Sequence, residues 1–159
     1  MEEVHGTTYL LNTVPISGII MPNNLKNKIT ILSTCLLSEN CVNLFNNALK
    51  AVSKQIESEN MNESKLIQTN VVFTHDGLAV FQMEAITLGF HMDLCLYNLN
   101  ALYNDKDNDE ILITGCFVEE LAHHFWFIDD EIEVKHKVFE ILKHIYPDIE
   151  LDYILKGMK

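Results

Sequence analysis

Two glutamates and two histidines interrupt an apolar stretch near the middle of the C-terminal half of the chain: Glu119, Glu120, His123 and His124. Carboxylates and imidazoles are the side chains that most often bind metal ions or transfer protons in proteins. If the stretch is a helix, Glu119 and His123 are four residues apart and lie one above the other on one face. This pair is therefore the first candidate for a functional site.

The surrounding residues, 109–126, predict a helix that is apolar around most of its circumference, which is typical of a buried helix. A polar group buried without a partner costs roughly 2 to 7 kcal/mol. We therefore expect a metal ion, a charge network or a water-filled cleft to meet the four polar side chains. The alternative is a less buried helix on which they form ordinary surface pairs.

The residues Glu119-Glu120-Leu121-Ala122-His123 resemble the zincin motif His-Glu-x-x-His, with Glu119 in place of the first histidine. The expected order of strands and helices over residues 28–145 also resembles a minimal zincin. The resemblance implies that Glu119 and His123 bind zinc and that Glu120 is the general base. It further implies water attack on a peptide or amide carbonyl as the reaction.

A zinc site of this kind needs a third protein ligand. Asp129 lies six residues beyond His123, which is the metzincin spacing, although Trp126 occupies the position of the metzincin glycine. Asp129 is equally well explained as the N-cap of the next helix. Glu133 and His136, on that next helix, are the alternative third ligands.

Two other interpretations use the same residues. The elements Glu120-x-x-His123 and Glu133-x-x-His136 match half of a di-iron carboxylate site, but such sites need four long helices, and this chain has too many expected strands. A carboxylate in place of the first imidazole also lowers the Lewis acidity of a bound metal. The alternative function is therefore a catalytically inactive, acidic protein-interaction module that keeps the fold without metal and binds a basic protein or peptide.

Composition narrows the partners and the compartment. The 159 residues carry a formal net charge of -12 and contain no arginine, which argues against nucleic acid as a partner. No run approaches the ~20 apolar residues of a membrane span, and no basic secretory leader is recognisable, so we expect a cytoplasmic protein without a membrane partner. The four cysteines stand in apolar surroundings without a Cys-x-x-Cys spacing, and we expect buried thiols.

Hydrophobic periodicity predicts the order of elements. Strands are expected over 8–21, 28–35, 66–74, 78–84 and 86–97, with an Asp76-Gly77 hairpin turn between the third and the fourth. A long amphipathic helix is expected after an N-cap at Ser38, and two further helices after residue 129. The prediction is a single α+β domain over residues 1–159, with a mostly antiparallel sheet, an early amphipathic helix, a buried motif helix and C-terminal helices.

Overall fold

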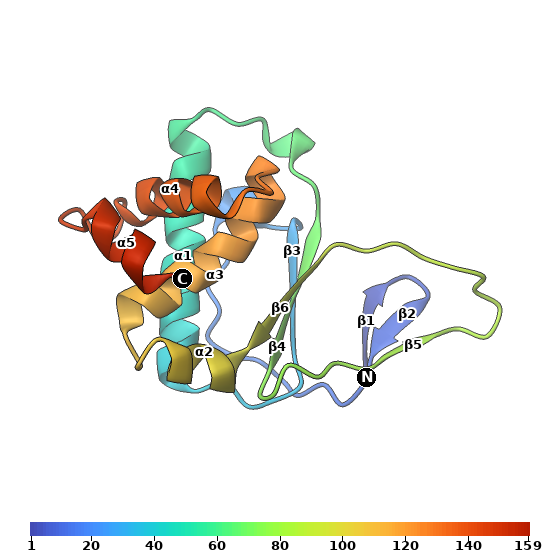
Figure 1. Cartoon of the computed structure of the whole chain (residues 1–159). Coiled ribbons are helices and arrows are strands. Elements are labelled where there is room, and N and C mark those ends of the chain that lie inside the picture. The colour runs from blue at the N-terminus through green and yellow to red at the C-terminus, as the bar shows by residue number, and fades with distance from the viewer.

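The fold described here is a computed structural model of residues 1–159, and it contains five α-helices and two three-stranded sheets (Figure 1). The α+β class predicted from the sequence is confirmed. The helices are α1 (Glu39–Ser58), α2 (Leu99–Asp105), α3 (Glu110–Trp126), α4 (Glu131–Leu142) and α5 (Leu151–Gly157). Two short 3-10 helices lie at Asn23–Leu25 and Glu63–Lys65.

The larger sheet is parallel, so the prediction of a mostly antiparallel sheet is wrong. Its strand order is β3 (Ile29–Ser33), β4 (Thr69–Thr74), β6 (Leu94–Asn98), and both neighbouring pairs are parallel. The cause is α1, which carries the chain from the end of β3 back to the start of β4, as a crossover between parallel strands must. All six residues of β4 are buried, as expected for a central strand covered on both faces.

The smaller sheet is antiparallel, in the order β1 (Glu2–His5), β2 (Thr8–Leu10), β5 (Phe81–Met83). The hairpin predicted at Asp76-Gly77 does not form, because β5 pairs with β2 and not with β4. The strand predicted over 86–97 is also shorter than expected: after β5 the chain makes a long loop around the small sheet before β6 begins at Leu94 (Figure 1).

The helices and the small sheet lie on opposite sides of the parallel sheet (Figure 1). The helix side holds the main core, in which α1 and α3 pack on Val71 and Phe73 of β4. The other side holds a separate small cluster of Leu10, Leu32 and Val72. Val71 and Val72 belong to different clusters because successive strand residues point to opposite faces.

Four aromatic rings fix α3 on the sheet. Phe45 of α1 meets Phe73 edge-on at 4.9 Å between ring centroids, and Tyr97 of β6 meets Phe117 of α3 at 5.0 Å and 87°. The Tyr97 hydroxyl also donates a hydrogen bond of 2.8 Å to the carbonyl oxygen of Phe117. Edge-to-face pairs and a satisfied buried hydroxyl favour one orientation of α3, and thereby one direction for its polar residues.

Candidate metal centre

The predicted motif helix is real. It is α3, with the Asp109 side chain as N-cap accepting a hydrogen bond from the Leu112 N–H, and it buries nine of its residues. The helix ends at Trp126, and the next residue, Phe127, adopts the left-handed conformation with φ of 53°. Glycine usually occupies such a position, so the turn required after the motif forms here without glycine.

This turn positions His123. Because the chain reverses at Phe127, the carbonyl oxygen of Ile128 comes to 2.5 Å from His123 Nδ1. A carbonyl oxygen only accepts, so Nδ1 carries the proton and Nε2 of the neutral ring keeps its lone pair. A backbone acceptor that orients the ring in this way is a regular companion of metal-binding histidines.

His123 lies beside two carboxylates. One is Glu119, one helical turn earlier on α3, and the other is Glu131, the first residue of α4, whose Oε1 lies 3.9 Å from Nε2. One ligand atom from each of the three residues lies within 4.8 Å of the other two. The group Glu119, His123 and Glu131 could therefore hold a metal ion.

The structure separates the other predicted ligands from this group. Asp129 lines a pocket beside His123, while Glu133 and His136 are exposed on α4, and none of the three belongs to the cluster. The N-cap of α4 is Asp130, whose carboxylate accepts from the Ile132 and Glu133 N–H groups, so the N-cap interpretation of Asp129 is wrong.

Sequence reasoning missed Glu131 as a ligand. A carboxylate in the first turn of a helix is favoured by the helix dipole, so the sequence around Glu131 gives no separate indication of a metal. What brings Glu131 to His123 is the 109° bend between α3 and α4. The only available signal was the short connection of four residues, 127–130, between two helices.

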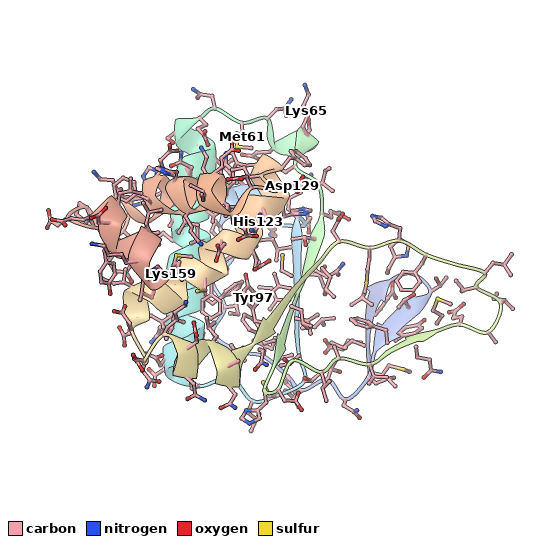
Figure 2. All side chains as sticks on the ribbon, in the orientation of Figure 1. Met61, Lys65, Tyr97, His123, Asp129 and Lys159 are labelled. Carbon is pink, nitrogen blue, oxygen red and sulfur yellow. The ribbon has the colours of Figure 1, made fainter.

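The pocket beside the cluster has a volume of about 370 Å³ and lies between the C-terminal end of α3 and the first residues of β4 and β6. His123 and Asp129, which are labelled in Figure 2, lie at this end of α3. Glu120 and Asp93 also line the pocket. His123 thus belongs to the metal-ligand cluster and also lines the pocket.

The carboxyl groups of Glu119 and Glu120 are harder to ionise than usual. Burial is the main reason that the pKa of Glu119 is raised, and the charges of Glu120 and Glu131 add to it while Lys135 and His123 oppose it. The pKa of Glu120 is also raised, mainly because the surrounding protein removes part of the water around its carboxyl group. The residue as a whole is still exposed to solvent, in the lining of the pocket. A cation near these carboxylates would favour their charged form.

His124 serves a different purpose. Its Nε2 lies 2.7 Å from the Ile67 carbonyl oxygen, ahead of β4. That contact ties α3 to the segment that leads into the parallel sheet. His124 also lines the pocket, but of the adjacent pair only His123 belongs to the metal-ligand cluster.

Comparison with known proteins adds no relative to this picture. No protein-family model, no curated protein and no solved structure matches the chain. No single helix is both long and apolar enough to cross a membrane; only α3 and α4 taken together pass that test, across their 109° bend.

Proposed function

We propose that this protein binds a divalent cation through Glu119, His123 and Glu131 and uses it to hydrolyse peptide or amide bonds. The observation that carries the proposal is the convergence of His123 with the Glu119 and Glu131 carboxylates, while the contact between its Nδ1 and the Ile128 carbonyl oxygen fixes the orientation of the ring. Three converging ligands leave coordination positions for water and substrate, as in catalytic metal sites.

The donor set favours a particular range of metals. One imidazole and two carboxylates suit Zn²⁺ and Mn²⁺ better than the soft ions that prefer sulfur. Zinc lies about 2.0 to 2.2 Å from each of its nitrogen and oxygen ligands. The ligand atoms of the three side chains are now up to 4.8 Å from one another, which is too far apart to meet one zinc ion at that distance, so the side chains must move slightly inward. Glu131 is exposed and can make this movement by a change of rotamer.

The catalytic part of the proposal rests on Glu120. A bound divalent cation would supply Lewis acidity to a water molecule and to a substrate carbonyl. Glu120 follows the first ligand directly, as the base does in the zincin motif, and it lines the pocket that His123 borders. With a cation bound nearby, its carboxyl group would be held in the charged form that a general base needs.

The first prediction concerns metal content. Protein purified without chelator or affinity metal should contain close to one Zn²⁺ or Mn²⁺ per chain by elemental analysis, and Glu119→Ala, His123→Ala and Glu131→Ala should each lower it at least tenfold. Glu133→Ala and His136→Ala are matched controls, because they change the same residue types on α4 outside the cluster. They should retain the metal.

Two results would reject this site. Metal-free parent protein that takes up neither ion at micromolar concentration is one, and equal metal loss in the two control variants is the other. If metal is present, a peptidase screen with Glu120→Gln tests the catalytic part separately. That variant should keep the metal and lose turnover by about 10²- to 10⁴-fold.

A further inference from the structure

A second surface of the molecule, remote in sequence from the metal-ligand cluster, is unusually apolar. It is the 78–96 segment, which includes β5, the long loop and most of β6. Leu78 is 71% exposed, Val80 57%, Ile86 85% and Leu88 fully, while Leu94 and Leu96 are more than a third exposed. The segment is about an eighth of the chain but holds more than half of its exposed large apolar side chains.

These side chains are not needed for the core. The segment alternates around β5: Ala79 and Phe81 turn toward the small cluster, whereas Leu78 and Val80 point away from it. On β6, Cys95 and Tyr97 are buried in the main core, and Leu94 and Leu96 face the other side. Exposed apolar side chains in such density mark interaction surfaces in soluble proteins.

The stretches that form the segment and the small sheet paired with it carry side-chain charges of one sign, with histidine counted as neutral. No lysine or arginine occurs in residues 1–25 or 66–105, the stretches that supply the whole small sheet, the loop and β6. Carboxylates do occur there, at Glu2, Glu3, Asp76, Glu84, Asp93 and Asp105. An occupant must therefore offer apolar side chains and positive charge together. A second copy of a chain with a net charge of -12 would bring like charges together instead.

We propose that the 78–96 segment docks a basic polypeptide segment in which lysine or arginine alternates with large apolar residues. The apolar side chains cover Ile86, Leu88 and their neighbours, and the basic side chains meet the surrounding carboxylates. The C-terminal end of this segment, at Asp93 and Leu94, lines the pocket beside His123. None of the three metal ligands lies in the segment, and Ile86 and Leu88 do not line that pocket.

The experiment uses the full chain and a synthetic peptide of alternating Lys and Leu as probe, with a Glu-Leu peptide of the same length as its counterpart. Binding is measured by isothermal titration calorimetry. The double variant Ile86→Ser/Leu88→Ser removes two side chains that are almost wholly exposed, so the fold is retained. Ile132→Ser is the matched control, because Ile132 is 66% exposed on α4, outside the segment.

The parent and Ile132→Ser should bind the Lys-Leu peptide equally, and the double variant at least tenfold more weakly. Glu84→Gln removes a charge while keeping an acceptor for the Tyr9 hydroxyl, and should weaken binding severalfold at low salt. Equal affinity for both peptides, or unchanged affinity in the double variant, would overturn the proposal. Two further results would overturn it. If the parent forms a dimer that only the double variant abolishes, the occupant is a second copy of the chain. If the parent binds neutral phosphatidylcholine vesicles and only the double variant does not, the occupant is lipid.

Discussion

At the scale of single residues, burial sets the chemistry of the thiols. Cys41 and Cys95 are almost completely buried and Cys116 is half-buried. Burial raises the pKa of Cys41 and Cys95 to about 11 and that of Cys116 to about 12. A thiol reacts as its thiolate, so these three cysteines are inert near neutral pH. Cys41 and Cys95 are buried as predicted, whereas Cys116 and the fourth cysteine, Cys35, are only partly buried, so the prediction of four buried thiols is half confirmed.

Labelling with a thiol reagent at pH 8 tests this. A pKa of about 11 leaves about one thiol in a thousand ionised at pH 8, against about one in ten at the ordinary value of 9.0. Native Cys35→Ser protein should therefore show no rapid labelling. The same protein in denaturant should be labelled at all three remaining cysteines. Rapid labelling of the native variant would mean that the three thiols are not enclosed as described.

The same groups predict how stability depends on pH. Above pH 9 the unfolded chain loses these thiol protons while the folded chain keeps them until about pH 11, so the unfolded state binds fewer protons. The free energy of unfolding should therefore fall as pH rises from about 9 to about 11, and these groups should have no effect below pH 9. Urea titrations of the parent and of a Cys95→Ala variant measure the difference, which should appear as a shallower alkaline decline in the variant.

At the scale of elements, the close approach of α5 to α3 depends on one glycine. A Cβ placed on Gly157 would lie 2.5 Å and 2.7 Å from the two Cδ atoms of Leu112 and 3.1 Å from its Cγ. The whole branched end of Leu112, not one flexible atom, would have to move. The end of α5 can therefore lie against the first turn of α3 only because it has no side chain at this position.

Gly157→Ala should lower the free energy of unfolding by about 1 to 3 kcal/mol, since overpacking outweighs the better helix propensity of alanine. Gly89→Ala is the control, because a Cβ there meets nothing within 4 Å and the backbone is not strained. It should change stability by less than about 0.5 kcal/mol. Equal effects in urea unfolding would show that α5 does not pack on α3 as described.

Elements with a clear helical period could be predicted from the sequence, whereas strand pairing could not. Ser38 and Asp109 act as N-caps of α1 and α3, which were expected to begin there. Parallel pairing was not predicted because the residues of a strand do not determine which other strand it pairs with. The Asp76-Gly77 pair favours a turn at that point but does not determine where the chain goes after the turn. Gly77 does have a positive φ of 82°, but the turn leads out to the small sheet instead of back along β4.

The candidate site shows the same division. Glu119 and His123 could be paired from their spacing on one helix, because the geometry of a helix is fixed by the backbone. The third residue depended on the direction of α4, which is set by the left-handed turn at Phe127 and by packing of Val134 and Val138 in the core. Neither Asp129 nor Glu133 could be distinguished from Glu131 without that direction.

At the scale of the whole molecule, stability is divided unevenly between the two sides of the parallel sheet. The helix side holds one continuous core around Phe45, Phe73 and Phe117, whereas the small sheet rests on a cluster of three fully buried apolar residues. The small sheet also buries one unpaired hydroxyl, that of Thr8. The small sheet should therefore open more readily than the rest of the chain.

Native-state hydrogen exchange should resolve this difference. Amides of β1, β2 and β5 should exchange through local opening at a lower free energy than those of β4 and α1, which should exchange only on global unfolding. Phe45→Ala, which should cost about 3 to 5 kcal/mol, should accelerate exchange in β4 and α1 by roughly 150- to 5,000-fold and leave the small sheet much less affected. A uniform acceleration would show that both sheets unfold as one unit.

The burial of β4 on both faces has a consequence for the order of events during synthesis. Phe73 leaves the ribosome 44 residues before Phe117, the ring that covers it from α3. At about 5 to 20 residues per second this interval lasts about 2 to 9 s. Throughout it, β3, α1 and β4 are already made but lack the cover that α3 supplies, so one face of the buried strand β4 stays partly open to solvent or to a chaperone until α3 is translated.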